Sequence, residues 1–375
     1  MIDCIAGRKR QRMNNRKNQG LIREESEQRE REILAPGAAL SINSRGRQTP
    51  EDACRIRTVY QRDRDRIVHS KSFRRLKGKT QVFLAPEGDH YRTRMTHTIE
   101  VSQIARTIAK ALRLNEDLTE AVALGHDLGH TPFGHAGEDV LNRLLPGGFS
   151  HHEQSVRVVE LLEKGGRGLN LTWEARNAIG LHYKGRKPLF DNSGSGLPAT
   201  LEGQVVRLAD VVAYVNHDLD DAIRASILVP QSIPADIYRL LGTSHRERIN
   251  SLVLDIITET QNEDLERIGM SREKGRALED LRDFLYEKVY FNPANRSEFE
   301  KAEGVMTSLW EYCTVDGDRF YRQFRPGRRD DEPLERTVAD VLAGMTDAYA
   351  LAIFDRLFIP DRRISIPNSI KSMGS

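Results

Sequence analysis

Histidines gather in one short stretch of the chain. The 375-residue sequence contains 11 histidines, and the stretch from 126 to 152 holds five of them, where even spacing would place about one. They stand among Gly, Thr and Pro: His126, His130, His135, His151 and His152. Neutral imidazoles combined with carboxylates form a mixed nitrogen and oxygen ligand set that suits Mn, Fe, Co, Ni or Zn. The cluster therefore favours a metal site.

A metal site of this kind needs ligands from more than one segment. Three features of the sequence could together supply four ligands. They are an inward-facing histidine, an adjacent His-Asp pair at a helix end, and a distant acid that would be costly to bury without a cation to coordinate. The four predicted ligands are His97, His126, Asp127 and Asp210. A His-Asp dipeptide alone carries little weight, because about one is expected by chance in this composition and a second pair begins at His217.

Helical spacing determines how these residues can meet. His97 precedes Val101 by one turn, on the apolar face that continues to Leu112. Asn115 is a suitable N-cap for the next helix, which runs into the sequence GHDLGH before Thr131-Pro132 ends it. The histidine cluster is therefore expected at a helix end.

A long helix is predicted from about residue 201. Its apolar residues recur in steps of three and four and form one stripe that faces a core. Asp210, Tyr214 and Asp218 follow at i, i+4 and i+8 and form a second, polar stripe among valines.

The remaining sequence predicts helix after helix. A helix start is expected at Thr49, with a hydroxyl for the N-cap, a proline at the next position and an acid at the third. Further helices are predicted over 136–145, 152–164, 173–182, 249–260, 274–290 and 338–358. No internal repeat and no alternating strand pattern appears, so the predicted fold class is all-α.

Three regions are expected along the chain. Residues 1–40 are charged and begin basic, which predicts a partly flexible arm. Residues 41–230 hold the predicted site and form the core. Residues 231–375 are predicted to be further helices packed on that core, because no linker-like composition follows the Ser-Gly loop at 191–196.

Composition excludes several classes of protein. The formal net charge of +2 gives no global electrostatic case for nucleic-acid or membrane binding, although the basic start and the Arg-rich stretch 62–79 leave a local contact open. The sequence has no apolar run long enough for a membrane span or a signal peptide. Cys4, Cys54 and Cys313 are too few and too scattered for a disulfide framework, so free thiols and a cytoplasmic location are expected.

Several motifs together resemble one protein family. In order and spacing they are similar to the HD-domain phosphohydrolases and, within them, to the dGTPase-like deoxynucleoside triphosphate triphosphohydrolases. The similarity covers residues 40–230 well and the remainder loosely. The motifs are RDRDRIVHSKSFRRLKGKTQVF, YRTRMTHT, GHDLGHTPFGHAGE, HHEQS, RLADVVAYVNHDLDDA and GMTDAYA.

The resemblance implies a role for each matching residue. It implies that the four residues proposed above bind the metal and that His135 with Glu138 forms the catalytic pair at the α-phosphate, as general base or general acid. Phosphate contacts are implied for Arg94, His130 and His152, and sugar contacts for Gln81, Tyr214 and Asp218. One position departs from the family pattern, because Val211 stands where relatives often carry a basic residue.

The implied activity is metal-dependent hydrolysis of dGTP or several dNTPs to a deoxynucleoside and tripolyphosphate. Mg²⁺ is expected on the triphosphate beside the first metal. A homo-oligomer, with hexamers common, and activating dNTPs at subunit contacts are expected by analogy. The alternative is a nucleotide-sensing or nucleic-acid-binding protein with secondary hydrolase activity. A guanosine-tetraphosphate or cyclic-dinucleotide phosphodiesterase lacks its motifs here.

Overall fold

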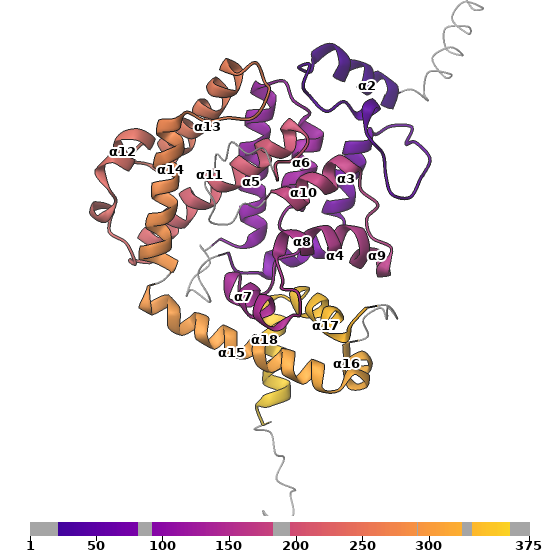
Figure 1. The fold of residues 1–375 in the computed structure, drawn as a ribbon, viewed down its shortest axis with the longest axis vertical. Coiled ribbons are helices and arrows are strands. Elements are labelled where there is room, and N and C mark those ends of the chain that lie inside the picture. Colours follow the sequence, from indigo (N-terminus) through magenta and orange to yellow (C-terminus); the bar gives the residue numbers. More distant parts are fainter. Residues whose placement is uncertain (1–21, 82–91, 183–195, 291, 325–331, 361–375) are drawn as a thin grey trace, which may run out of the picture.

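The fold is built from helices, as the sequence predicts (Figure 1). The structure is a computed structural model that describes residues 22–81, 92–182, 196–290, 292–324 and 332–360. Within these ranges no strand forms, and only two isolated bridges join extended segments, Arg47 with Thr172 and Thr80 with Thr93. The all-α prediction is confirmed.

The first part of the described chain forms the helices that surround the histidine cluster. Two are short 3₁₀ turns, η1 and η2, and one, η3, is a π-helical turn that continues α8. The elements are α2 (Ile22–Ile33), η1 (Ser41–Asn43), α3 (Val59–Val68), α4 (Lys71–Arg75), η2 (Leu76–Gly78), α5 (Arg94–Ala111), α6 (Glu116–Gly125), α7 (His135–Leu144), α8 (His151–Arg157), η3 (Val158–Leu162), α9 (Glu163–Gly166) and α10 (Trp173–Leu181).

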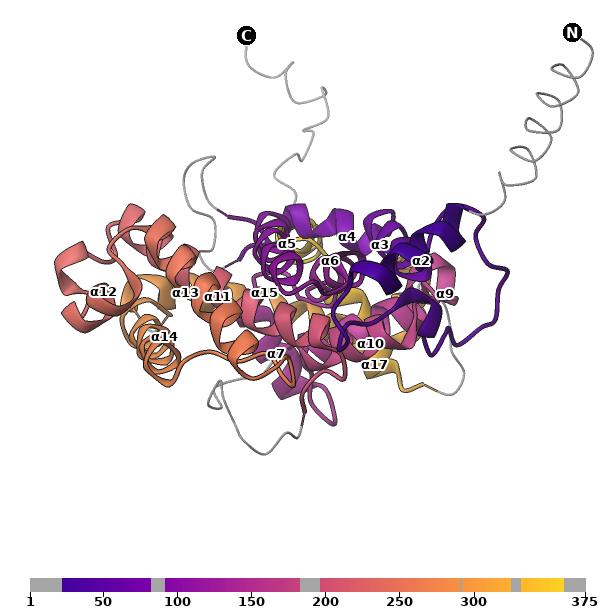
Figure 2. The same ribbon diagram turned by 90° about the horizontal axis from the view of Figure 1, so that it is seen from above.

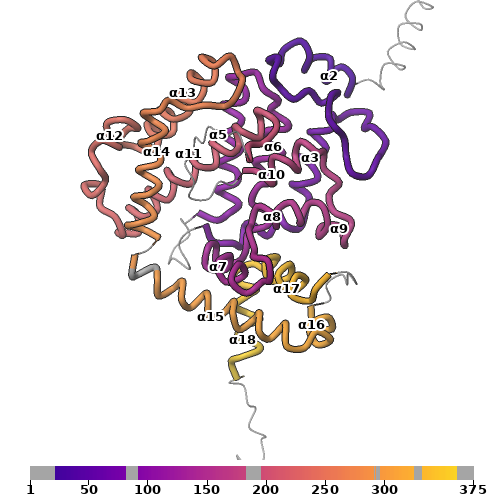
Figure 3. The backbone as a smooth tube through the Cα atoms, in the orientation of Figure 1, coloured from indigo at the N-terminus to yellow at the C-terminus, as the bar shows by residue number. Residues whose placement is uncertain are grey.

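The second part begins with the predicted long helix. It continues through helices that flank the core on two sides, as Figures 1 and 3 show. The elements are α11 (Leu201–Arg224), η4 (Pro230–Ser232), α12 (Ala235–Leu241), α13 (His245–Asn262), α14 (Arg272–Leu285), η5 (Tyr286–Tyr290), α15 (Pro293–Val315), α16 (Gly317–Phe324), α17 (Leu334–Ala343) and α18 (Asp347–Phe358).

Side-chain caps define where several of these helices begin. The Asn115 side chain accepts hydrogen bonds from two backbone amides of α6, which confirms the predicted cap. The predicted start at Thr49 is wrong, because α3 begins at Val59 with Thr58 and Gln61 in a capping box. Tertiary bonds explain the difference: the backbone of Thr49 exchanges two hydrogen bonds with the side chain of Asn170, which holds this segment outside any helix.

Two hydrophobic clusters divide the interior. The first joins α3, α5, α6, α10 and α11 with the flanking helices α12 to α14. The second joins α7 with α15, α17 and α18, so that residues such as Val140 and Met306 share one core although they lie far apart in the chain. Figure 2 shows α12 and α14 at one end of the flattened body and α2 and α9 at the other. The predicted boundary at residue 230 remains a prediction.

The predicted helix over 338–358 is in fact two helices. The chain turns by 119° between α17 and α18, and Thr346 caps the second helix through its side chain. Within the described residues, no single helix is both long and apolar enough to cross a bilayer. The bent pair of α17 and α18 has, among these residues, the length and composition for a broken span, and nothing beyond length and composition points to one.

Several sequence predictions fall partly outside the described residues, among them the Ser-Gly loop, of which residues 191–195 lie outside. Of the predicted arm, residues 1–21 lie outside, and Ile22–Ile33 form α2. Cys4 also lies outside, whereas Cys54 and Cys313 are free thiols, as expected.

Candidate metal centre

The four predicted metal ligands converge from two helices, α5 and α11, and from the turn that follows α6. Nε2 of His97 lies 3.1 Å from an Asp210 carboxylate oxygen and 3.8 Å from one of Asp127. Nε2 of His126 lies 3.5 Å from Asp127 and 3.8 Å from Asp210. Three of the four could hold one ion with ligand atoms within 4.8 Å of one another, and Asp210 lies beside them. This arrangement could bind a divalent cation.

His126 is oriented as a ligand. Its Nδ1 lies 2.7 Å from the carbonyl oxygen of Ala123, so that nitrogen carries the proton and donates. The lone pair is then on Nε2, which is fully buried and has no hydrogen-bond partner among the described residues. A buried acceptor without a donor is costly, and a cation at this point would satisfy it. The residues present therefore fit a metal.

His97 is held from its other side. Its Nδ1 lies 2.9 Å from Nε2 of His217, and Nδ1 of His217 lies 2.8 Å from the Asp218 carboxylate. Burial alone would lower the pKa of His97, but its bond to Asp210 together with the negative charges of Asp210 and Asp127 raises the pKa. A proton thus competes for the position that a cation would take, since a ligating imidazole must be neutral.

Asp127 is surrounded by positive charge. The buried Arg94 guanidinium donates to its Oδ2 at 2.9 Å, and His126 and His130 lie close to the same carboxylate. Burial raises the pKa of Asp127, but these neighbours together hold it well below its usual range. Asp210 behaves similarly: against burial, His97 and His126 lower its pKa to about 2. Both carboxylates are therefore ionised and ready to ligate.

Arg94 was predicted to contact phosphate. The structure places it against Asp127, with a second amino group 3.5 Å from the carbonyl oxygen of Gln81. A guanidinium has five N–H donors, so a bond to Asp127 leaves capacity for a further anion. The phosphate role remains a prediction.

The turn that carries His126 and Asp127 is pinned to α8. The Ser155 hydroxyl donates to the carbonyl oxygen of His126 at 2.6 Å and accepts from the amide of Gly129 at 2.9 Å. A Cβ atom on Gly129 would lie 2.2 Å from the backbone nitrogen of Ser155. Only glycine allows this approach, which brings the α6 end and α8 together at the site.

A second group of histidines adjoins the ligands. The Glu138 carboxylate contacts His151 most closely, at 2.9 Å from its Nδ1 and 2.8 Å from its backbone nitrogen. It lies 3.9 Å from Nδ1 of His135, its predicted partner. Burial raises the pKa of Glu138, but His151 outweighs burial and lowers it to about 2. Glu138 is thus hydrogen-bonded to His151 and lies within ion-pair distance of His135, and the role of the predicted His135–Glu138 pair remains a prediction.

The other predicted phosphate contacts lie nearby. The ring of His130 stacks on that of His151 with centroids 4.0 Å apart, and its Nε2 is 3.5 Å from Asp127. Burial, and then the charges of Arg94 and His151, keep the pKa of His130 well below its ordinary value. His152 lies at the edge of the cluster, 5.8 Å from His151 between ring centroids.

The predicted sugar residues come from α11 and from the segment that follows η2. Tyr214 and Asp218 follow Asp210 along α11, as the spacing predicts. The Tyr290 hydroxyl donates to the Asp218 carboxylate. Gln81 is buried, and its Oε1 has no hydrogen-bond partner among the described residues. Val211, the departure from the family pattern, is packed in the hydrophobic core.

Sequence reasoning missed four residues at this site. His151 was counted in the cluster without a role, and His217 was dismissed as part of a chance dipeptide. His182 packs 5.0 Å from His126 between ring centroids, and burial lowers its pKa to about 3. Tyr290 comes from η5, 72 residues beyond Asp218. The sequence holds one signal for these residues. It is the second His-Asp pair, which begins at His217, one turn after Tyr214 on the same predicted helix.

Comparison with known proteins identifies the architecture. The HD domain matches residues 94–215, and the phosphohydrolase-associated domain matches residues 268–356. These ranges correspond to the helices that carry the four ligands and to the helices from α14 onward.

Close relatives cover nearly the whole chain. The deoxyguanosinetriphosphate triphosphohydrolase-like protein of Caldanaerobacter subterraneus is 53% identical over 339 residues, which is 90% of this chain and 96% of the relative. Proteins of the same name from Desulfatibacillum aliphaticivorans and Clostridium perfringens are 48% and 50% identical, over 90% of this chain and 98% of each relative. The chain belongs to the family of HD-domain, deoxyguanosinetriphosphate triphosphohydrolase-like proteins.

Proposed function

We propose that this protein hydrolyses a deoxynucleoside triphosphate, dGTP or several dNTPs, to the deoxynucleoside and tripolyphosphate in a metal-dependent reaction. One observation carries the proposal: two imidazoles and two aspartates converge, and the free Nε2 of His126 points among them without a partner in the described structure. The names of the close relatives support the substrate class.

The metal ligands would be His97, His126, Asp127 and Asp210. A divalent cation held there, Mn²⁺ or another transition metal, supplies a water of lowered pKa and neutralises phosphate charge. The donor set suits such a cation because it mixes neutral imidazole with carboxylate. Mg²⁺ bound to the triphosphate is a further expectation, since it prefers substrate oxygens.

His135 is the proposed proton-transfer residue at the α-phosphate. Its side chain is 45% exposed in this structure, so it can reach a bound substrate. Glu138, which is ionised and hydrogen-bonded to His151, lies 3.9 Å from Nδ1 of His135 and would orient its ring in the reaction. Arg94, His130 and His152 would contact the phosphates.

The sugar would lie against α11. Tyr214 provides an apolar ring beside the site, and the Asp218 carboxylate would accept a hydrogen bond from the 3′ hydroxyl. Gln81 has a free buried acceptor that would be satisfied by a donor on the sugar. A 2′ hydroxyl would be excluded by the tyrosine ring through its size.

The proposal is tested by assaying the purified protein for tripolyphosphate release from all four dNTPs with Mn²⁺ or Mg²⁺. Release from at least one dNTP, and its loss in His126→Ala and Asp210→Ala, is expected. His245→Ala, which changes a histidine paired with Asp220 away from the centre, serves as the matched control. A wild-type protein that is silent with every metal, or full activity in both ligand variants, would refute the proposal.

The role of His135 has its own test. His135→Ala is expected to retain metal and nucleotide binding and to lose turnover, because the residue is assigned to chemistry and not to ligation. Isothermal titration with Mn²⁺ and a single-turnover assay separate the two properties. Loss of metal in this variant would contradict the assignment.

The arginine-rich segment gives the alternative, a primarily nucleic-acid-binding protein, less support than its sequence suggests. Three of its arginines on α3 are committed to acids: Arg62 and Arg66 bind Glu51, and Arg64 binds Asp117. Charges neutralised in this way are poor phosphate ligands. Oligomer formation, activation by dNTPs and a cytoplasmic location remain predictions.

A further inference from the structure

The turn that leads into His135 has a backbone conformation that its residues do not favour on their own. Phe133 has a φ of +61°, in the left-handed region that a bulky side chain rarely adopts. Gly134 follows with a φ of +57°, and α7 begins at the next residue, His135. The direction in which His135 leaves the turn therefore depends on the contacts that hold Phe133 in this conformation.

Asp347, in the first turn of α18, holds this turn from outside. The backbone amide of Phe133 donates to Oδ1 of Asp347 at 2.9 Å. The other carboxylate oxygen, Oδ2, accepts from the backbone amide of Thr80 at 2.9 Å and from the Thr80 hydroxyl. One carboxylate thus joins the turn before His135 to the segment that leads to Gln81, although it lies 214 residues beyond Phe133.

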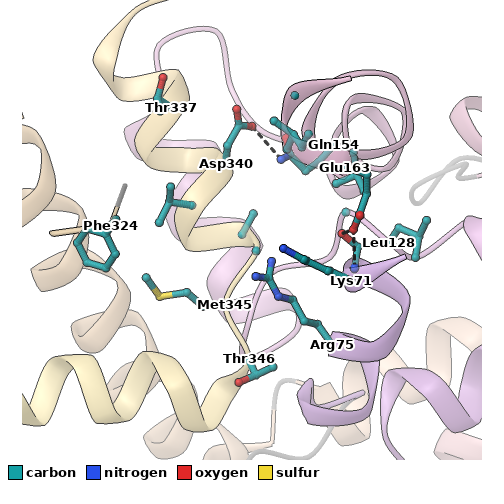
Figure 4. A pocket seen from close by; sticks show the side chains of 18 of the residues that line it. Lys71, Arg75, Leu128, Gln154, Glu163, Phe324, Thr337, Asp340, Met345 and Thr346 are labelled. Atoms are coloured by element: carbon teal, nitrogen blue, oxygen red, sulfur yellow. Dashed lines mark hydrogen bonds between the residues drawn. The ribbon is translucent and has the colours of Figure 1, made fainter. Parts of the chain in front are cut away.

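Packing keeps Asp347 within reach of both segments. The Phe133 side chain is buried in the second hydrophobic cluster, which also contains Met345. A Cβ atom on Gly78 would lie 3.0 Å from the side chain of Thr346, so η2 lies directly against the residue before Asp347. Met345 and Thr346 form the turn between α17 and α18, where they line a cavity of about 650 Å³ (Figure 4). This turn is therefore fixed against the segments that the Asp347 carboxylate bonds.

A second bond holds the other end of the same loop. Lys79 is buried, and its Nζ donates to the carbonyl oxygen of His130. The same Nζ donates at 2.7 Å to the carbonyl oxygen of Ala343, the last residue of α17. Residues 130–133 are therefore connected to the end of α17 and the start of α18 at both ends, through an ammonium at His130 and a carboxylate at Phe133.

We propose that Asp347 is a positioning residue for His135: its carboxylate holds the turn at Phe133 and so determines where the imidazole of His135 lies relative to the substrate. The inference rests on the proposed function, because the role of His135 in proton transfer does. It gives the GMTDAYA motif, which contains Asp347, a part in the site although the motif contacts neither the proposed ligands nor the proposed catalytic pair directly. A misplacement of about 1 Å can cost about a hundredfold in rate, so such a contact matters for turnover.

The test compares Asp347→Asn and Asp347→Ala with Asp355→Asn, which makes the same chemical change at an exposed position of α18. An amide side chain has one acceptor oxygen where the carboxylate has two, so Asp347→Asn keeps at most one of the two backbone contacts and Asp347→Ala keeps neither.

Hydrogen exchange of the metal-free protein, resolved to the Phe133 amide by mass spectrometry, gives the first measurement. We expect this amide to exchange at least about tenfold faster in both Asp347 variants, because it loses a bond to a charged acceptor. The amides of α5 and α6 should exchange as in the wild type, and Asp355→Asn should change neither.

Turnover gives the second measurement. In Asp347→Asn we expect kcat per bound Mn²⁺ to fall at least about tenfold, while the KM for the dNTP and the affinity for Mn²⁺ stay within about threefold of the wild type. The reason is that the four proposed ligands and the residues proposed to contact the sugar are held by other bonds. A role in stability alone would leave kcat per bound metal unchanged.

Thr80→Val removes only the hydroxyl bond to the same carboxylate, and it should shift both measurements in the same direction by less. Its result decides the question if the Asp347 variants do not fold, which thermal unfolding verifies. Wild-type exchange at Phe133, faster exchange along α5 and α6 as well, or a wild-type kcat with a loosened turn would overturn the inference. A wild-type protein that hydrolyses no dNTP would refute the proposed function, and the exchange at Phe133 would then decide by itself whether Asp347 holds the turn.

Discussion

His97 and His217 face each other across α5 and α11, with Nδ1 of the first 2.9 Å from Nε2 of the second. Nε2 of His97 can offer a lone pair to a cation only when its Nδ1 carries the proton. Nε2 of His217 then accepts the hydrogen bond from the protonated Nδ1 of His97. The other ring nitrogen of His217, Nδ1, lies 2.8 Å from the Asp218 carboxylate. With His97 as a metal ligand, as proposed above, His217 would be a positioning residue that favours the ligating tautomer of His97.

We expect His217→Ala to weaken Mn²⁺ binding by about 10- to 100-fold, because the ligand loses its oriented tautomer. His217→Gln is expected to recover part of the affinity, since its amide oxygen can accept the same hydrogen bond. Calorimetric titration with Mn²⁺ measures both, with His245→Ala as the control. A variant that loses stability but retains wild-type metal affinity would reduce His217 to a packing residue.

Metal binding is expected to stabilise the fold. Because the four ligands come from separate segments, a cation that binds the folded chain raises its free energy of unfolding, by about 2.7 kcal/mol when its free concentration is a hundred times the dissociation constant. Thermal unfolding with Mn²⁺ and with a chelator measures the shift. Asp210→Ala should lose most of it, and an equal shift in that variant would place the ion elsewhere.

The pair of Glu138 and His151 predicts a pH dependence of stability in the metal-free protein. Despite burial, His151 lowers the pKa of Glu138 from 4.5 to about 2, so its contribution is present above pH 4.5 and is lost as the pH falls toward 2. Glu138 raises the pKa of His151 above 6.5 against burial, so that contribution is complete below pH 6.5 and is lost as the pH rises through the raised value.

The difference in unfolding free energy between the wild type and Glu138→Gln should therefore be largest between pH 4.5 and 6.5. Urea unfolding in a chelator across this range measures it, with the exposed Glu153→Gln as the control. A difference that does not change with pH would show that the two groups are not coupled.

Gly129→Ala should damage the turn that carries the ligands. The added Cβ would lie 2.2 Å from the nitrogen of Ser155 and 2.5 Å from the carbonyl oxygen of His151, so α8 must shift. We expect a loss of about 3 kcal/mol or more in stability, together with weaker metal binding. Gly304→Ala in α15 meets nothing within 4 Å and should instead stabilise by about 0.5 to 1 kcal/mol. Chemical denaturation of both variants compares them directly, and equal effects would contradict the packing argument.

Arg47→Ala tests a buried ion pair that fastens α10 to α3. Arg47 pairs with the fully buried Asp63, which also accepts from the amide and hydroxyl of Thr172. Removing the arginine leaves a buried charge and should cost about 3 to 5 kcal/mol. Arg57→Ala breaks a more exposed pair with Asp65 and should cost about 1 kcal/mol or less. Urea denaturation measures both, and a small effect at Arg47 would mean that water reaches Asp63.

Local patterns in the sequence were enough for much of the fold. The cap at Asn115, the apolar face that follows His97 and the i, i+4, i+8 stripe from Asp210 each depend on neighbours within a few residues, so spacing alone predicts them. The four candidate ligands could be predicted because a buried carboxylate among valines and a histidine on an apolar face both call for a partner of a particular chemistry.

Tertiary contacts decided what remained. Thr49 has every local feature of a helix start, but its bonds to Asn170, 121 residues away, hold it outside any helix. Glu138 contacts His151 more closely than the nearer-in-sequence His135, and His217 acquires a role because α5 lies beside it. The cavity drawn in Figure 4 likewise joins residues of α4 to residues of α17. Such contacts form between segments whose separation carries no periodic signal, so only the packing of the helices determines them.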